Sequence, residues 1–284
     1  MTISIAHLGP NGTYAEQAAL AYVNWVRQET GQEAILCPYP SIAQTVRAVD
    51  QGEVDLAVVP VENSIEGSVA VTLDTLWQLD NLQIQLALVL PIAHALLSHA
   101  QSLESIQTVY SHPQALAQCQ GWLEQFLPNV QLIATNSTTE VLQQLEHDCT
   151  ISAIASLRAS QLYNLPILAS GINDYPDNCT RFWVLAQSQQ PQIKGASHTT
   201  LAFSVRANVP GALVKPLQVF AQRGINLSRI ESRPSKRSLG DYLFFIDLEA
   251  DANSALVQSA LAELAAYTEI LKLFGSYNVL AIRG

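Results

Sequence analysis

VDLAVVPVENSIEGSVAVTLDTLW, residues 54–77, contains a strand, a polar turn and a helix in immediate succession. The apolar run 54–61 is short, rich in Val and bounded by turn residues, which is typical of a buried strand. The turn then offers a carboxylate, an amide and a hydroxyl at Glu62, Asn63 and Ser64. These residues either bind a ligand or only shape the turn. A helix is expected over 67–77, and a glycine at its start would let backbone N–H groups approach a ligand closely.

The same succession recurs through the first 190 residues. Further strands are expected near 3–8, 84–90, 108–110, 132–134 and 151–155, and further helices near 14–28, 113–126 and 138–145. Alternating strands and helices predict α/β layers with parallel strands, and ligands bind such sheets at the carboxyl ends of the strands. Because the polar turns fall at these ends, the sequence predicts two similar lobes with a cleft between them.

Two capping boxes mark expected helix starts in this region. Thr13 precedes Glu16 by three residues, and Ser137 precedes Glu140 by the same spacing. In a capping box the hydroxyl and the carboxylate satisfy free backbone N–H groups in the first helical turn. We therefore expect helices to begin just after Thr13 and just after Ser137, the first of them ending at Gly31.

A second, smaller domain is expected beyond the two lobes. A chain of 284 residues exceeds the size at which one core is most comfortable, and 49% hydrophobic with 13% charged residues suits packed domains. A polar stretch without periodicity, residues 187–192, indicates a linker. The elements expected after it are a strand at 199–205, a helix at 211–223, strands at 225–232 and 242–248, a helix at 254–266 and a strand at 270–274. This βαββαβ order is ferredoxin-like, so we predict domains over 1–187 and 198–284 joined by a linker over 188–197.

Charge and hydropathy argue against two classes of partner. The net charge is −10 with 14 Lys and Arg in total, so the positive surface that binds phosphate backbones is missing and no nucleic-acid partner is expected. The N-terminus lacks a basic region followed by a long apolar stretch. The most apolar run, 86–97, is interrupted by Pro91 and His94 and is too short to cross a bilayer. We expect no membrane attachment and a cytoplasmic location.

The cysteines give no sign of a metal site. Cys37, Cys119, Cys149 and Cys179 are widely scattered, form no CxxC pair and have no histidine at zinc-ligand spacing. Ordinary buried thiols are the preferred interpretation, and no metal is expected.

A second polar turn, Ser111-His112-Pro113-Gln114, leads into the expected helix at 113–126. Ser111 is a natural N-cap, and capping alone would explain it. Gln118 lies two turns along the same helix face, so a row of hydrogen-bonding groups from Ser111 to Gln118 is geometrically possible. His112 beside them is either a general acid or a surface residue.

The third polar segment, Asn178-Cys179-Thr180-Arg181-Phe182, precedes an apolar strand pattern. Thr180 would present a hydroxyl and Arg181 a cation for a carboxylate. Neighbouring residues on a strand face opposite sides, so Arg181 could instead form an ion pair between the lobes. The three segments are rich in uncharged hydrogen-bonding groups, which suit an anionic substrate better than a metal ion.

The order and content of these motifs resemble the prephenate dehydratase family. The resemblance begins at Gly9-Pro10-Asn11-Gly12-Thr13-Tyr14, continues through Pro60 to Ser64, Ser111 to Gln114 and Thr135-Asn136-Ser137-Thr138, and ends at Asn178 to Phe182. It implies a two-lobed catalytic domain like the lobes of periplasmic binding proteins. It also implies that prephenate loses CO2 and water to give phenylpyruvate. Aromatisation drives this step, so neither a cofactor nor a metal is expected.

The resemblance also assigns roles to individual residues. Thr180 matches the family's catalytic threonine, and we expect it to donate a hydrogen bond to the departing oxygen. The other catalytic residues that the resemblance implies are Glu62, Asn63, Ser111 and Gln118. The substrate-binding residues that it implies are Thr13, Ser64, Asn178, Arg181 and Phe182.

The C-terminal domain resembles an ACT domain, a ferredoxin-like module that senses amino acids. Two segments carry this resemblance, Gly211-Ala212-Leu213 and Glu231-Ser232-Arg233-Pro234. It implies that L-phenylalanine binds where Gly211, Ala212 and Leu213 of one chain meet Asn226, Leu227, Ser228 and Glu231 of another. Feedback inhibition within a homodimer or homotetramer is expected, with activation as the alternative.

Two alternative functions remain open, a different substrate and a different class of protein. Arogenate, which carries an amino group where prephenate has a keto group, would fit the same motifs. A non-catalytic two-lobed amino-acid sensor is the second alternative, and Thr180 argues against it. With no room before Ile3 for a fused mutase domain, the chain is expected to act alone on prephenate.

Overall fold

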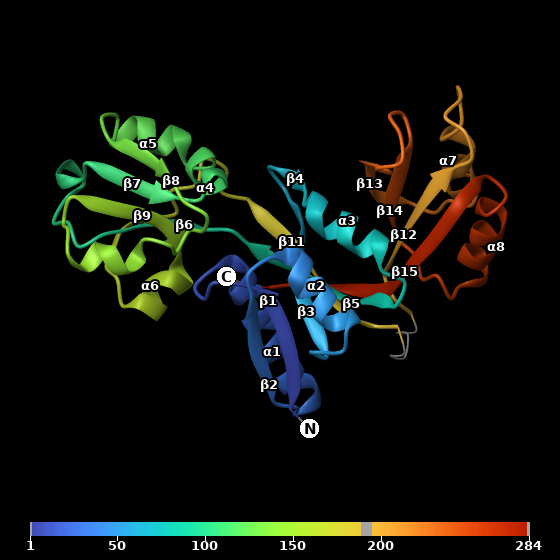
Figure 1. Cartoon of the computed structure of the whole chain (residues 1–284), viewed down its shortest axis with the longest axis horizontal. Coiled ribbons are helices and arrows are strands. Elements are labelled where there is room, and N and C mark those ends of the chain that lie inside the picture. The colour runs from blue at the N-terminus through green and yellow to red at the C-terminus, as the bar shows by residue number, and fades with distance from the viewer. Residues whose placement is uncertain (1, 189–194, 283–284) are drawn as a thin grey trace.

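The computed structural model describes residues 2–188 and 195–282, which form two α/β lobes and a C-terminal domain (Figure 1). Two sheets organise them. A ten-stranded sheet has the order β13-β14-β12-β15-β5-β11-β3-β1-β2, with β4 paired to β3, and a five-stranded sheet has the order β10-β6-β9-β7-β8. The predicted fold class, two α/β lobes followed by a ferredoxin-like βαββαβ domain, is confirmed.

Lobe 1 is formed by one half of the larger sheet and three helices. Its strands are β1 (Ile3–Leu8), β2 (Ala34–Tyr39), β3 (Leu56–Asn63), β4 (Gly67–Ser68), β5 (Leu82–Pro91) and β11 (Cys179–Gln187), and its helices are α1 (Tyr14–Thr30), α2 (Ile42–Asp50) and α3 (Ala70–Gln78). Strand β1 is parallel to β2 and β3, whereas β11 is antiparallel to both β3 and β5. The prediction of parallel strands holds for β1, β2 and β3 but is wrong for β11, because the chain re-enters lobe 1 from lobe 2 in the opposite direction.

Lobe 2 contains the five-stranded sheet and short helices. Its elements are β6 (His94–Leu97), η1 (Leu103–Ser105), β7 (Thr108–Ser111), α4 (Pro113–Ala117), α5 (Gln120–Phe126), β8 (Gln131–Ala134), η2 (Leu142–Glu146), β9 (Ile151–Ser156), α6 (Leu157–Tyr163) and β10 (Ile167–Ser170). Two segments connect the lobes, one between β5 and β6 and one between β10 and β11 (Figure 1). A ligand between the lobes would therefore lie close to both connections.

The C-terminal domain shares its sheet with lobe 1. Its elements are β12 (His198–Val205), α7 (Val214–Ala221), β13 (Leu227–Pro234), β14 (Tyr242–Leu248), α8 (Ala255–Leu264) and β15 (Thr268–Ala281). The first part of β15 pairs with β12, and its last residues, Asn278 to Ala281, pair in parallel with β5 of lobe 1. Figure 1 shows β15 running from the C-terminal domain into the central sheet. Of the predicted linker over 188–197, residues 189–194 lie outside the described residues.

The close approach of β15 to β5 requires a glycine. Gly275 has φ +117°, a conformation that side chains rarely adopt, and a Cβ built there would lie 3.0 Å from the Ile84 carbonyl oxygen. The adjoining core also crosses the domain boundary, since Trp183 of lobe 1 and Phe245 and Tyr277 of the C-terminal domain are fully buried in one cluster.

Several predicted helix bounds need correction. Residues 67–68 form β4 in a hairpin with β3, so the helix expected over 67–77 begins at Ala70. The helix expected over 113–126 is interrupted at Gln118 and Cys119. Over 138–145 only the 3-10 helix η2 forms, and there the Glu140 carboxylate accepts from Asn136 N–H. The helix expected over 211–223 starts at Val214.

The first predicted helix is confirmed at both ends. Thr13 is the N-cap of α1, and its hydroxyl accepts from Glu16 N–H. The Glu16 carboxylate reaches back to Gly12 N–H at 2.7 Å, one residue earlier than in a standard capping box. Gly31 closes the helix in a left-handed conformation, φ 70°.

Candidate active site

A cavity of about 480 Å³ opens between the two lobes. Lobe 1 contributes to its wall from β1, α1, β3 and β11, and lobe 2 from β6, α4 and the loop after β8. Its lining residues are Leu8, Gly9, Pro10, Thr13, Tyr14, Ala15, Pro40, Ile42, Pro60, Asn63, Val69, Ile92, His94, His112, Gln114, Ala115, Gln118, Asn136, Ser137, Thr138, Thr180 and Phe182. Among these lining residues there is no Lys, Arg, Asp or Glu, so neutral hydrogen-bonding groups surround the space.

Five predicted site residues line this cavity: Thr13, Asn63, Gln118, Thr180 and Phe182. Their convergence follows from the pairing of strands, because Asn63 at the end of β3 lies directly opposite Thr180 on the antiparallel strand β11. The Asn63 Nδ2 atom donates to Thr180 Oγ1 at 3.0 Å. Both side chains are buried.

A network of amides surrounds this pair. Asn63 Nδ2 also donates to Asn178 Oδ1 at 2.8 Å, and Asn178 Nδ2 donates to Gln118 Oε1 at 2.9 Å. Gln118 Nε2 completes the ring by donating to Asn63 Oδ1 at 3.3 Å. Gln118 comes from lobe 2, whereas the other two amides come from lobe 1 and the segment that enters it. The site is therefore complete only when both lobes are in place.

The interruption of the helix at Gln118 fixes this residue in place. Its backbone carbonyl accepts from Asp174 N–H at 2.9 Å. The Asp174 carboxylate in turn accepts from the N–H groups of Gly121 and Trp122, in the first turn of α5. The segment that returns to lobe 1 thus holds both ends of the break between α4 and α5.

The titratable groups of the cavity wall are held neutral. Burial lowers the pKa of His94 and of His112, which disfavours their cationic forms. Burial raises the pKa of Tyr14 well above its ordinary value, which keeps the phenol protonated. At neutral pH the site therefore presents hydrogen-bond donors without a fixed side-chain charge.

Three of the predicted residues support the wall without lining it. The Ser111 hydroxyl donates to the Ile154 carbonyl at 2.6 Å, which turns it away from a substrate. The Ser64 hydroxyl donates to Asn178 Oδ1 at 3.3 Å and accepts from Cys179 N–H. Asn178 belongs to the amide network. The N–H of Ser64 donates to the Cys179 carbonyl, so it is not available to a ligand carboxylate.

Glu62 and Arg181 lie on the other side of the strands. They are cross-strand partners, and Arg181 Nη1 lies 3.5 Å from Glu62 Oε2 and 3.4 Å from Asp247 Oδ2. Neither residue lines the cavity. Strand alternation explains this, since each follows or precedes a residue that faces the cleft. The expectation that Arg181 contacts substrate is corrected in favour of the alternative, an ion pair, which here joins lobe 1 to the C-terminal domain.

Sequence reasoning missed Tyr14 and His94 as site residues. Tyr14 stands at the end of the motif that begins at Gly9, and the motif was the signal that could have indicated it. His94 appeared only as an interruption of an apolar run. In the structure that interruption is the connection between the lobes, and the His94 ring lies at the cavity wall.

The predicted effector residues lie on the C-terminal domain. Gly211 has φ +80° and lies three residues before α7, so it is not at the start of the helix as expected. Asn226 donates to Glu249, and Ser228 donates to the Asp247 carbonyl. Glu231 Oε2 accepts from the Ser68 hydroxyl at 3.1 Å. Glu231 therefore contacts the hairpin that carries Asn63.

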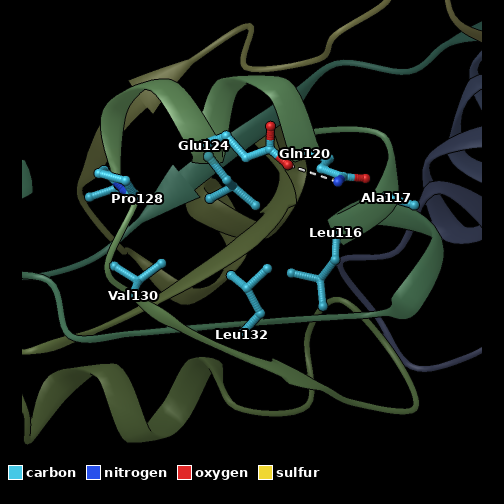
Figure 2. A pocket seen from close by; sticks show the side chains of 9 residues that line it. Leu116, Ala117, Gln120, Glu124, Pro128, Val130 and Leu132 are labelled. Carbon is cyan, nitrogen blue, oxygen red and sulfur yellow. Dashed lines mark hydrogen bonds between the residues drawn. The ribbon is translucent and has the colours of Figure 1, made fainter.

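A second cavity, of about 300 Å³, lies within lobe 2 between α5 and β8 (Figure 2). Its walls are mainly aliphatic, with Leu116, Val130 and Leu132 on one side, and its polar groups, Gln120 and Glu124, hydrogen-bond to each other at 2.8 Å. None of the predicted site residues lines it.

Over residues 2–188 and 195–282, no group of three or more His, Cys, Asp or Glu side chains is placed to hold a metal ion. In the same ranges, no helix is long and apolar enough to cross a membrane.

Comparison with known proteins identifies the class. A sequence model of the prephenate dehydratase family matches residues 5–190, and one of the ACT domain matches residues 199–266. These matches define a hydro-lyase with a C-terminal ACT domain. The chain belongs to the prephenate dehydratase family. The alternative of a non-catalytic sensor is therefore set aside.

Individual relatives agree with this assignment. The chain is 37% identical to a prephenate dehydratase of Lactococcus lactis over 99% of both chains. It is 43% identical to a bifunctional chorismate mutase/prephenate dehydratase of Aquifex aeolicus, over 97% of this chain and 73% of that protein. A crystal structure of prephenate dehydratase from Arthrobacter aurescens in complex with L-Phe has a TM-score of 0.86 and 34% identity, covering 97% of this chain and 90% of that chain.

Proposed function

We propose that this chain catalyses the decarboxylating dehydration of prephenate to phenylpyruvate, water and CO2, a step of L-phenylalanine biosynthesis. One observation carries the proposal. The buried Thr180 hydroxyl oxygen accepts a hydrogen bond from Asn63 Nδ2 at 3.0 Å, at the wall of a cavity lined by neutral groups. Because this oxygen is an acceptor, its own hydrogen is free to point toward a ligand.

The reaction needs a donor at one oxygen atom. The bond between the ring and its carboxylate breaks, CO2 leaves, and the electron pair moves through the ring to expel the hydroxyl on the opposite carbon. That oxygen takes up one proton and leaves as water. Thr180 is positioned to donate to the departing oxygen, while Asn63 stabilises negative charge that develops on Thr180 Oγ1. A single oriented donor of this kind contributes a factor of about 100 to 1,000 in rate.

Helix α1 supplies a site for a substrate carboxylate. The backbone N–H groups of Tyr14 and Ala15 are in its first turn, where no carbonyl of the helix can accept from them. Both residues line the cavity, together with the Thr13, Ser137 and Thr138 side chains. The aligned peptide dipoles of a 17-residue helix favour an anion at this end. A carboxylate can thus be bound here without an arginine.

The same cavity favours prephenate over arogenate. Arogenate carries an ammonium group, which is stabilised by a carboxylate or several acceptors. The residues that line the cavity include no Asp or Glu. The test is to compare kcat/KM for the two substrates with the purified chain. Higher kcat/KM for prephenate supports the proposal, and a strong preference for arogenate contradicts it.

We further propose feedback inhibition by L-phenylalanine at the ACT domain of a homodimer or homotetramer. The L-Phe complex of the Arthrobacter aurescens enzyme supports a phenylalanine effector. Two contacts join the ACT domain to the part of lobe 1 that carries the active site, and through them effector binding would change that site. They are Glu231 with Ser68 and Asp247 with Arg181. An effector ammonium bound by Glu231 would withdraw this carboxylate from Ser68 and release the hairpin that carries Asn63. Initial rates with prephenate at increasing L-phenylalanine test this, and unchanged rates contradict it.

A further inference from the structure

His94 lies at the junction of the two lobes and is 3% exposed. Its backbone N–H donates to Asn173 Oδ1 at 2.7 Å, and the Asn173 Nδ2 atom donates to the Ile92 carbonyl at 2.9 Å. The two segments that connect the lobes are thus hydrogen-bonded to each other. The imidazole is fixed in the cavity wall by this arrangement, and the mechanism above gives it no role.

Both ring nitrogens of His94 have side-chain partners from different lobes. Nε2 lies 3.0 Å from Gln118 Oε1, and Nδ1 lies 2.9 Å from the Tyr14 hydroxyl oxygen. A carbonyl oxygen only accepts, so the hydrogen must be on Nε2. Nδ1 of the neutral ring then accepts from Tyr14, whose single hydrogen is shared with the Ala93 carbonyl, also at 2.9 Å. The contacts therefore select one tautomer.

The direction of every amide in the network is fixed at Asn63, whose Oδ1 accepts from the backbone N–H groups of Ile65 and Glu66, each at 3.1 Å. Gln118 Nε2 donates to the same oxygen, so Gln118 Oε1 faces the two donors Asn178 Nδ2 and His94 Nε2. Asn63 Nδ2 is then left to face Thr180 Oγ1. If the Gln118 amide were reversed, its NH2 group would face two donors and its oxygen would face an acceptor.

We propose that His94 is a positioning residue: as an Nε2–H donor it holds the Gln118 amide of lobe 2 against Asn63, the residue whose Nδ2 donates to the Thr180 hydroxyl oxygen. This inference rests on the proposed function for its kinetic consequence. The hydrogen-bond direction itself does not depend on which substrate is bound.

A matched pair of substitutions distinguishes loss of the hydrogen bond to Gln118 from loss of the packing of the imidazole ring. In His94→Gln the side-chain amide reaches the position of Nε2 and can donate to Gln118. In His94→Asn the amide reaches only the position of Nδ1 and can serve Tyr14 but not Gln118. We expect His94→Gln to retain kcat within about tenfold and His94→Asn to lose about 100-fold in kcat, with KM changed less than about threefold in both. Equal losses in the two variants would overturn the proposal.

A second measurement needs no substitution and no turnover. The 15N and 1H shifts of the His94 ring in the wild-type protein report which nitrogen carries the hydrogen. The Nε2–H tautomer is expected, and the Nδ1–H tautomer contradicts the proposal even if the variants fail to fold. Absence of phenylpyruvate formation by the wild type would refute the proposed function instead, and the ring tautomer would still decide whether His94 donates to Gln118.

Discussion

Arg181 Nη1 lies 3.4 Å from Oδ2 of Asp247, so a carboxylate of the ACT domain holds the residue that follows Thr180 on strand β11. Asp247 is completely buried and also accepts from Arg229 Nε at 2.8 Å and from the Thr200 hydroxyl at 2.7 Å. Strand β13, which carries Arg229 and the proposed effector residue Glu231, is thereby linked to β11, which carries Thr180, through a single side chain.

Asp247→Asn keeps the shape of this side chain but removes its charge. We expect the free energy of unfolding to fall by about 3 kcal/mol, because two arginines lose their shared buried counter-charge. The response to L-phenylalanine should also weaken by at least threefold in the half-inhibiting concentration. Urea unfolding and inhibition curves measure the two effects. Glu29→Gln, at an exposed site on α1, is the matched control for loss of one negative charge. Equal stability of the two variants would contradict the prediction.

Thr180→Ala should lower kcat by about 100- to 1,000-fold, because it removes the donor to the departing oxygen. Thr180→Ser keeps the hydroxyl and should retain kcat within about tenfold. Steady-state formation of phenylpyruvate from prephenate is the measurement. Undiminished turnover by the alanine variant would remove Thr180 from the chemistry.

Ser68→Ala and Glu231→Ala distinguish binding of L-phenylalanine from its proposed effect on the active site. Glu231→Ala should abolish binding of L-phenylalanine in calorimetry. Ser68→Ala should leave that binding within about threefold of wild type but reduce the maximal inhibition, since only the contact between β4 and β13 is removed. Identical calorimetric and kinetic behaviour of the two variants would argue against this route.

The buried histidines make stability depend on pH. Burial lowers the pKa of His7, His94 and His112 in the folded protein below the unfolded value of about 6.5. The unfolded state therefore binds more protons below that pH, so these groups reduce stability as the pH falls from about 7 through their folded pKa values. His7→Gln should flatten the decline in unfolding free energy between pH 7.5 and about pH 5.5 relative to the wild type. An unchanged decline in the variant would contradict this assignment.

Gly275→Ala tests the approach of β15 to β5. It forces a side chain into φ +117° and against the Ile84 carbonyl, and we expect a loss of about 2–4 kcal/mol in unfolding free energy. Gly171→Ala has a positive φ of 64° but open space around the added Cβ, so its loss should be about 1 kcal/mol. Similar losses at both positions would show that the contact with Ile84 is unimportant.

Local pattern was enough to predict much of the site. Strand alternation correctly separates Thr180 from Arg181, and the motif resemblance brings Asn63, Gln118 and Thr180 to one cavity. Alternation also explains why Glu62, which we expected to be a catalytic residue, does not line the cavity. It was expected in a turn before a helix, whereas β3 continues through Asn63 and pairs with β4, which puts Glu62 beside Arg181.

Long-range pairing accounts for what the sequence could not predict. The return of β11 as an antiparallel strand depends on the path through lobe 2, which no local periodicity records. The role of Ser111 differs for a similar reason, since its hydroxyl is satisfied by the Ile154 carbonyl on the neighbouring strand β9. His94 was missed because one apolar run, 86–97, contains parts of two strands that belong to different lobes.

Strand β15 also constrains the order in which the protein can assemble. It is synthesised after every other described strand, yet it pairs with β5 in the sheet of lobe 1. Until β15 is in place, that edge of β5 exposes unpaired backbone groups, which can recruit strands of other chains. The catalytic lobe therefore reaches its final form only after the regulatory domain has been made, and a chain shortened before Asn278 should aggregate rather than yield an unregulated enzyme.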